Sequence, residues 1–408
     1  MAGFRPCIIV TAGKMYYDKR KSFSGYPEKK QKSREERIEY IMTSEFLSDL
    51  AAGLEPYVPG EQPKDKKYIK LNTNENPYPP SAEVIRAIEE ETANLRLYPD
   101  PDATAVRTAA AEYYNDTLNL AGTDRLTEDN IFVGNGSDEV LAFLFPTFFK
   151  GKKIAFADIT YSFYPVYAAL FEVSYDLLPL KEDFSLDMEQ YCGGLAGDIR
   201  GILICNPNAP TGRALPLADV ERILDANSGR LVVVDEAYVD FGAETAAGVV
   251  NRHENLVVTQ TLSKSRQLAG MRVGIAIASA PLIAGLNAVK NSFNSYTADR
   301  LAIAAAAAAF RDREYFETTK RKIMETRELV TKEFRKLGFD VLPSAANFLF
   351  VEPVGISAAD LFGKLRERGI LVRYFPKPRI DRRLRITVGT QEEMDTLMAS
   401  VREILKEC

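Results

Sequence analysis

Asn255-Leu-Val-Val-Thr-Gln-Thr-Leu-Ser-Lys-Ser-Arg-Gln-Leu-Ala-Gly-Met-Arg-Val-Gly-Ile-Ala-Ile-Ala278 is the most informative run of the chain. Its two ends, 255–260 and 273–278, are apolar and rich in β-branched residues, which predicts two buried strands around a loop. The loop places Lys264 among hydroxyl side chains and Arg272 eight residues later. Because lysine amines form imines with aldehydes and arginine binds phosphate bidentately, this loop is suited to a phosphorylated aldehyde. A solvated loop with two unrelated cations is the alternative.

Outward from this run, short apolar strands alternate with helices. Strands are expected at 130–133, 153–158, 173–178, 200–205 and 230–235, and helices at 81–95, 103–115, 139–147, 163–171 and 217–226. Such alternation indicates an α/β sandwich with a largely parallel sheet. We therefore expect a large domain over residues 81–291.

The pattern changes after residue 291. A long helical region over 292–337 precedes strands at 346–351, 370–373 and 384–388 and helices at 358–368 and 391–406. This order predicts a smaller α+β domain over 292–408 that includes a linking helix. An N-terminal arm over 43–80 is expected to pack on this smaller domain.

The N-terminal 42 residues differ from the rest of the chain. They carry ten Lys/Arg, five Asp/Glu and few apolar anchors, a composition typical of disorder. We expect 1–42 to be a disordered extension, and hypothesise either that translation starts at Met42 or that 1–41 form a floppy tail. Because the whole chain has a net charge of −5, the remaining residues sum to −10. An acidic body argues against nucleic acid as a partner.

Composition limits the other classes. The 408 residues are 46% hydrophobic and 27% charged, as in ordinary globular proteins of two or three domains. Four scattered cysteines without a CxxC pair indicate reduced thiols and a cytoplasmic location. The single histidine, His253, excludes a multi-histidine metal site or a histidine-based triad, so no metal is expected. The apolar stretch 301–310 is too short to span a bilayer, so no membrane partner is expected.

Polar residues follow the expected strands at their carboxyl ends, where open α/β sheets bind ligands. Asp235 ends an apolar strand, and is either a salt-bridge partner or a ligand for a cationic ring nitrogen. Tyr238 and Asn206 are placed to hydrogen-bond a phenolate. The loop 134–139 offers backbone amides at a helix start, a phosphate site, although a plain turn is the simpler interpretation.

Together these residues form the set that a pyridoxal 5'-phosphate site requires. Lys264 would hold the aldehyde as an imine, and Asp235 would keep the ring nitrogen protonated. Asn206 and Tyr238 would stabilise the ring phenolate. Tyr161 would stack on the ring, unless it is a core aromatic. The phosphate would be held by hydroxyls, a guanidinium and helix amides of Thr261, Ser263, Arg272, Ser137, Asp138 and Glu139.

At this point the chain resembles the fold-type I pyridoxal-phosphate aminotransferases, and within them the histidinol-phosphate aminotransferase family. The resemblance runs in family order from about residue 45 to the C-terminus. Its motifs are Tyr57-Val-Pro-Gly-Glu-Gln-Pro63, Leu71-Asn-Thr-Asn-Glu-Asn-Pro77, Tyr98-Pro-Asp, Asn206-Pro-Asn-Ala-Pro-Thr-Gly212, Asp235-Glu-Ala-Tyr238, Ser263-Lys264 with Leu-Ala-Gly-Met-Arg272, Val372-Arg-Tyr-Phe375 and Leu384-Arg-Ile-Thr-Val-Gly-Thr390. Two residues depart from the family pattern: Ala209 replaces a usual asparagine, and Gln260 a common arginine.

The resemblance implies further roles. Tyr98 would reach the cofactor phosphate of a neighbouring subunit, which implies a homodimer with shared active sites. Arg385 would bind the α-carboxylate of glutamate, and Arg373 would join it for the phosphate of histidinol phosphate, since two arginines suit a near-dianion. For both arginines, a solvated strand edge is the alternative. Tyr57 and Asn74 would belong to the substrate pocket.

The implied activity is transamination between glutamate and the phosphorylated substrate in histidine biosynthesis. Lys264 would act as general base and acid. Two enzymes on the same fold stay open as alternatives, an aromatic amino-acid aminotransferase and a threonine-phosphate decarboxylase. A non-catalytic regulatory protein is the remote alternative, whose sign would be loss of Lys264 or Asp235; both are present.

Overall fold

The computed structural model describes residues 45–407. The predicted extension over 1–42 and the start at Met42 lie outside the described residues. Residues from Glu55 onward form one compact unit, whereas the short helix α2 (Asp49–Ala52), capped by Ser48, belongs to a separate unit. No helix within 45–407 has both the length and the hydropathy needed to cross a membrane.

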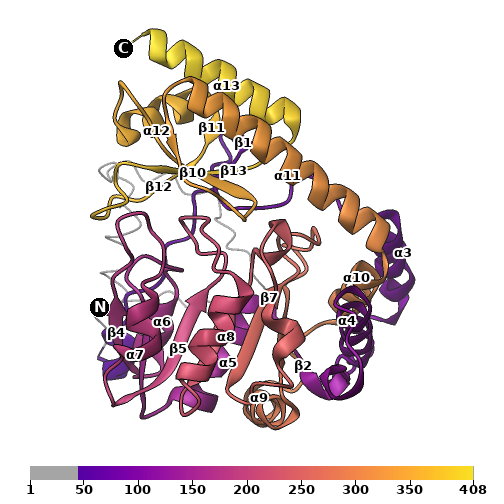
Figure 1. The fold of residues 1–408 in the computed structure, drawn as a ribbon. Coiled ribbons are helices and arrows are strands. Elements are labelled where there is room, and N and C mark those ends of the chain that lie inside the picture. Colours follow the sequence, from indigo (N-terminus) through magenta and orange to yellow (C-terminus); the bar gives the residue numbers. More distant parts are fainter. Residues whose placement is uncertain (1–44, 408) are drawn as a thin grey trace, which may run out of the picture. The chain divides into compact units, whose positions relative to one another are not determined.

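The centre of the compact unit is a seven-stranded sheet (Figure 1). Its order is β2-β8-β7-β6-β5-β3-β4, with β8 antiparallel to both neighbours and every other pair parallel. This arrangement confirms the predicted α/β fold with a mostly parallel sheet. The strands are β2 (Ile131–Asn135), β3 (Lys153–Ala157), β4 (Ser174–Leu178), β5 (Ile199–Cys205), β6 (Leu231–Asp235), β7 (Leu256–Thr261) and β8 (Val273–Ala278).

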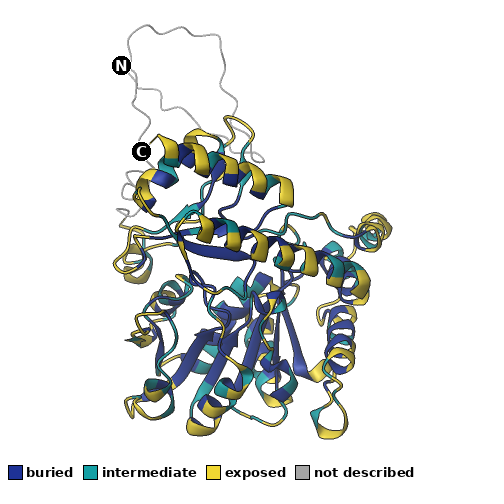
Figure 2. Cartoon of the chain, turned by 45° about the horizontal axis from the view of Figure 1, so that its top comes forward, coloured by how far each residue is buried: buried dark blue, intermediate teal, exposed yellow. Residues whose placement is uncertain are grey.

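Helices cover both faces of this sheet because its strands are apolar on both sides. Along β6, Val232 and Val234 pack into one hydrophobic cluster and Val233 into the other. Figure 2 shows buried strands between helices whose outer sides are exposed. One face holds α3 (Ala82–Glu91), α4 (Thr104–Thr117), α7 (Met188–Gly193), α8 (Leu217–Ala226) and α10 (Arg300–Arg311). The other holds α5 (Gly136–Leu144), α6 (Tyr164–Leu170) and α9 (Ala280–Phe293).

A second, four-stranded antiparallel sheet has the order β12-β13-β10-β9. It packs with three helices around its own apolar cluster. The N-terminal strand β1 (Ile69–Lys70) pairs in parallel with β11 (Ile370–Leu371) beside it. The other elements are α11 (Arg313–Lys336), β9 (Asp340–Val341), β10 (Phe348–Glu352), α12 (Ala358–Glu367), β12 (Arg373–Tyr374), β13 (Leu384–Thr387) and α13 (Gln391–Lys406).

The helical region predicted over 292–337 is largely helical, but it is interrupted at 294–299 and at 312. The chain leaves α9 after Phe293 and starts two separate helices, α10 and α11. Each start is capped by an aspartate: Asp299 accepts from the amide of Ala302, and Asp312 from that of Tyr315. A side chain that satisfies these free amides stabilises a new helix start, which apolar periodicity alone does not reveal. The predicted domain boundaries stay predictions.

Candidate active site

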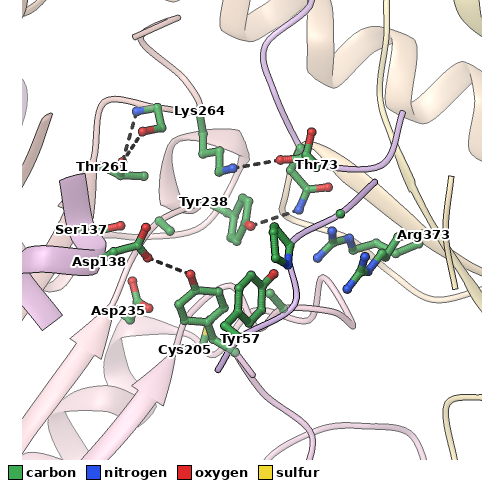
Figure 3. Close-up of a pocket in the computed structure, with 18 of the residues that line it drawn as sticks. Tyr57, Thr73, Ser137, Asp138, Cys205, Asp235, Tyr238, Thr261, Lys264 and Arg373 are labelled. Carbon is green, nitrogen blue, oxygen red and sulfur yellow. Dashed lines mark hydrogen bonds between the residues drawn. The ribbon is translucent and has the colours of Figure 1, made fainter. Parts of the chain in front are cut away.

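A cavity lies where the carboxyl ends of β5, β6 and β7 meet the N-terminus of α5 and the strands β12 and β13 (Figure 3). The close-up shows side chains from both sheets pointing toward one another. Of the residues predicted from sequence, the cavity is lined by Tyr57, Asn74, Ser137, Asp138, Tyr161, Asp235, Tyr238, Thr261, Ser263, Lys264, Arg272, Arg373 and Arg385. These predicted residues, which come from distant parts of the sequence, therefore line one common cavity.

Lys264 follows β7 and points into this cavity. Its Nζ donates to the backbone oxygen of Thr73 at 3.1 Å and lies 5.9 Å from the ring centroid of Tyr238. Burial, and then the positive charge of Arg385, lower the pKa of Lys264 to about 8. A larger fraction of the amine is therefore neutral near physiological pH, as a nucleophile and proton acceptor requires.

Asp235 ends β6 and is 3% exposed. Tyr164 donates to its Oδ2 at 2.9 Å, and the Thr259 hydroxyl donates to its Oδ1 at 3.2 Å. Burial raises the pKa of Asp235 to about 6, and these two donors oppose the rise. A cation beside this carboxylate would hold it ionised, which suits a protonated ring nitrogen.

Beside the N-terminus of α5, the cavity has the features of an anion-binding site. Arg272 contacts Asp138 Oδ2 at 3.1 Å and Ser263 Oγ at 3.3 Å, beside the first turn of α5. A Cβ on Gly274 would lie 2.3 Å from the amide nitrogen of Ser137, so only glycine lets β8 approach this turn so closely. A Cβ on Gly136 would lie 2.4 Å from Arg272 Nη2. The two glycines thus leave room for amides, hydroxyls and a guanidinium around one anion.

Tyr161 and Tyr57 form an aromatic wall of the cavity. Tyr161 donates to Asp138 Oδ1 at 2.8 Å, which fixes its ring at the cavity edge. Tyr57 packs on Phe163 with ring centroids 4.7 Å apart. Such an arrangement suits a planar ring between the wall and Lys264.

Two arginines lie together at the opposite end. Arg373 on β12 is paired in register with Arg385 on β13. Arg385 Nη2 donates to the backbone oxygen of Asn72 at 3.0 Å, while its buried Nε has no partner within 45–407. Arg373 Nη2 donates to the backbone oxygen of Val58 at 3.3 Å. Their remaining donors can bind one anion with two guanidinium groups.

Three predicted site residues do not line the cavity. The amide of Asn206 is turned away because its Nδ2 donates to Leu215 O at 3.0 Å and its Oδ1 accepts from Leu215 N at 2.8 Å. Glu139 accepts from the Asn135 amide at 2.6 Å at the start of α5. Tyr98 is 79% exposed and stacks on Tyr296 at 4.7 Å. The prediction that Asn206 faces the ring oxygen therefore does not fit this geometry.

Sequence reasoning also missed part of the lining. The missed residues that line the cavity are Pro59, Gly60, Asn72, Thr73, Cys205, Ala209 and Ala237. Asn72 and Thr73 lie inside a motif that the sequence had marked, beside Asn74. Tyr164, which is fully buried and donates to Asp235, was not singled out from the sequence either.

Within 45–407, no group of three or more His, Cys, Asp or Glu is arranged to hold a metal ion. The site's donors are instead an amine, a carboxylate, hydroxyls and guanidinium groups.

Comparison with known proteins places this geometry in a family. Residues 66–401 match the family model described as aminotransferase class I and II. The chain is 53% identical over 364 residues to the histidinol-phosphate aminotransferase of Clostridium acetobutylicum, covering 89% of this chain and 99% of that one. It is also 53% identical to that of Acinetobacter baumannii (strain AB307-0294), covering 88% and 97%.

Solved structures show the same fold. Histidinol-phosphate aminotransferase from Sinorhizobium meliloti, in complex with pyridoxal-5'-phosphate, has a TM-score of 0.79 at 24% identity and covers 90% of this chain and 99% of its own. Aspartate aminotransferase from Thermus thermophilus with maleate has a TM-score of 0.72 at 18% identity, covering 83% and 92%. From the family match and the identity to whole-length relatives, the chain belongs to the class I and II aminotransferases, with the histidinol-phosphate aminotransferases.

Proposed function

We propose that the chain is a pyridoxal 5'-phosphate-dependent transaminase that exchanges an amino group between glutamate and imidazole-acetol phosphate, giving histidinol phosphate in histidine biosynthesis. The observation that carries this proposal is one cavity with Lys264 and Asp235 between Arg272 at one end and paired arginines at the other. The whole-length relatives at 53% identity bear the same activity in their names.

The residues present fit this cofactor. Lys264 would hold its aldehyde carbon, Asp235 would pair with its ring nitrogen, and Arg272 would bind its phosphate together with nearby hydroxyls and amides. The close approach at Gly274 supports the last assignment, because a side chain there would displace the turn that carries the Ser137 amide. When bound, pyridoxal 5'-phosphate supplies an electron sink for charge that develops on the substrate carbon.

The chain's own residues supply the proton transfer and the binding. Lys264, with a pKa near 8, is suited to take the α-proton of the substrate as a base and return it as an acid. Arg385 would bind the substrate anion next to the reacting carbon, and the burial of its Nε strengthens that contact. Arg373 would add a second guanidinium for a phosphate.

A single-turnover panel tests this function. Purified protein is mixed with histidinol phosphate, phenylalanine or threonine phosphate, and conversion of the bound cofactor is followed by absorbance. We expect histidinol phosphate to react fastest. Faster reaction of phenylalanine would indicate the aromatic aminotransferase, release of carbon dioxide from threonine phosphate would indicate the decarboxylase, and no reaction with any donor would favour a non-catalytic protein.

Replacing Arg373 with alanine should separate the two half-reactions. We expect the second-order rate constant for histidinol phosphate to fall about 10- to 100-fold, as for loss of one charged hydrogen bond of about 1.5–3 kcal/mol. The glutamate half-reaction should change much less, because a monoanion is bound by Arg385. Equal losses in both half-reactions would rule out the phosphate role of Arg373.

A homodimer is a further part of this proposal. Tyr98 and Phe293 are 79% and 78% exposed, and Tyr296 stacks on Tyr98. Exposed aromatic side chains are enriched at protein interfaces. We propose that Tyr98 reaches the cofactor phosphate of a neighbouring subunit, so light scattering of the purified protein should give twice the chain mass. The expected cytoplasmic location stays a prediction.

A further inference from the structure

We propose that Thr387 and Asn74 are positioning residues, which turn the hydroxyl hydrogen of Tyr238 toward the ring oxygen of the bound cofactor. This inference rests on the proposed function and adds Thr387, a residue that does not line the cavity. It follows from the directions of three hydrogen bonds.

The first step is the orientation of the Asn74 amide. Thr387 Oγ1 accepts from the backbone N–H of Asn74 at 3.0 Å, so its own hydrogen is free to be donated. That hydrogen goes to Asn74 Oδ1, also at 3.0 Å. With the amide oxygen facing Thr387, the hydroxyl donates to Oδ1 while it accepts from the backbone N–H, whereas a turned amide would leave the hydroxyl hydrogen without this acceptor. The NH₂ group therefore faces the opposite way.

The second step is the orientation of the Tyr238 hydroxyl. Asn74 Nδ2 donates to Tyr238 Oη at 3.0 Å, as the dashed line in Figure 3 shows. A phenolic oxygen that accepts from this amide keeps its own hydrogen for another acceptor. Tyr238 lines the cavity, so that hydrogen is available to an oxygen placed there.

Thr387, Asn74 and Tyr238 form a hydrogen-bond relay, and buried contacts hold this relay in place. Asn74 and Thr387 are 1% and 2% exposed, so bulk water does not replace a lost partner. Asn347 Nδ2 donates to the backbone oxygen of Asn74 at 3.0 Å, which stabilises the left-handed backbone of Asn74 (φ 57°). Phe348 packs edge-on against Tyr238 with centroids 5.1 Å apart.

The direction of this hydroxyl matters because nearby amides point elsewhere. Asn206 is bound to Leu215, as described above. Asn208 Nδ2 donates to Ile159 O and to Thr211 Oγ1, both at 3.0 Å. The sequence analysis assigned the hydrogen bonds to the cofactor's ring oxygen to Asn206 and Tyr238, and in this geometry only Tyr238 of the two is placed to donate one.

The relay also links the substrate end to the cofactor. Thr387 and Arg385 are two positions apart on β13 and so share a strand face. The guanidinium of Arg385 lies 5.5 Å from the ring centroid of Phe348, which packs on Tyr238. One strand therefore carries both the arginine for the substrate anion and the hydroxyl that orients Tyr238.

The test is a spectrophotometric pH titration of the cofactor-loaded protein. Thr387→Val removes the hydroxyl at nearly constant shape, which frees the Asn74 amide to turn its oxygen toward Tyr238. Tyr238 would then donate to Asn74, leaving more negative charge on the cofactor's ring oxygen. We expect the midpoint of the visible absorbance change to rise by about one pH unit, the size for losing one hydrogen bond to a charged oxygen.

Other charges facing Tyr238 are unchanged in this variant. They belong to Arg385, Asp235, Lys264 and the Cys205 thiol. Thr387→Ser keeps the hydroxyl and should restore the wild-type midpoint. Thr331→Val is the matched control, because its buried hydroxyl donates to Arg327 O at 2.8 Å within α11. Tyr238→Phe sets the largest shift expected from this donor.

The possible outcomes distinguish a failure of the proposed relay from a failure of the proposed function. A wild-type midpoint in Thr387→Val, together with a raised midpoint in Tyr238→Phe, would overturn the relay and leave the function standing. Absence of any titrating visible band in the wild-type protein would instead refute the proposed function. If Thr387→Val does not fold, Thr387→Ala provides the same comparison, and an unshifted midpoint there also overturns the relay.

Discussion

Lys264→Ala is expected to abolish turnover, with a fall of more than about 10⁴-fold in the single-turnover rate. This size follows because the replacement would remove both the proposed nucleophile and the proposed general acid–base, and an acid–base group alone contributes about 10²- to 10⁴-fold. The buried amine, with its pKa lowered to about 8, is the proton acceptor that the site's geometry offers to the substrate carbon. The visible band of bound cofactor should disappear as well. Rapid-mixing absorbance measures both effects.

Lys336→Ala is the matched control for this experiment. Its side chain is 71% exposed on α11 and pairs with Glu333, far along the chain from the cavity lining. We expect wild-type turnover from this variant. If the turnover of Lys264→Ala lay within tenfold of wild type, the proposed catalytic role of Lys264 would be refuted.

Asp235→Asn should give the second largest loss. The amide keeps the shape of the side chain but removes the negative charge beside the cofactor's ring nitrogen. Breaking a buried, hydrogen-bonded charge pair costs about 3–5 kcal/mol, which corresponds to a fall of about 10²- to 10⁴-fold in turnover. Steady-state kinetics with saturating cofactor measures this loss, and turnover within twofold of wild type would contradict the assignment.

In the cofactor-free protein, Asp235→Asn should increase the stability of the fold. Burial raises the pKa of Asp235 from its ordinary value to about 6, so the folded state binds a proton more readily than the unfolded state. The protonated Asp235 side chain therefore stabilises the fold at low pH, and this contribution is lost as the pH rises through about 6. At pH 8, Asp235→Asn is expected to raise the melting temperature without cofactor. Lower stability and lower activity together would instead indicate a damaged fold.

Much of the fold followed from local patterns. The predicted ranges 217–226 and 391–406 coincide with α8 and α13, because both have a clear apolar stripe and α13 has a capping box at Thr390. The two interruptions of the helical region over 292–337 were not predicted. Only the aspartate caps reveal those breaks, and their role depends on backbone direction.

The site residues could be predicted from the sequence where a reactive side chain lies at the end of a buried strand. Asp235 and Lys264 end or directly follow buried strands, so their side chains meet at one edge of the sheet. Asn206 also follows a strand, but its amide is turned by a proline-containing loop and binds Leu215. Sequence patterns do not specify that rotation. The contact from Thr387 to Asn74 spans 313 positions and depends on tertiary packing.

Sodium borohydride reduction followed by peptide mapping tests the central claim most directly. Purified holoprotein is reduced, digested and analysed by mass spectrometry for a pyridoxyl-phosphate adduct. The adduct is expected on Lys264, within the loop between β7 and β8. A stoichiometric adduct on another lysine, or no adduct at all, would contradict the account.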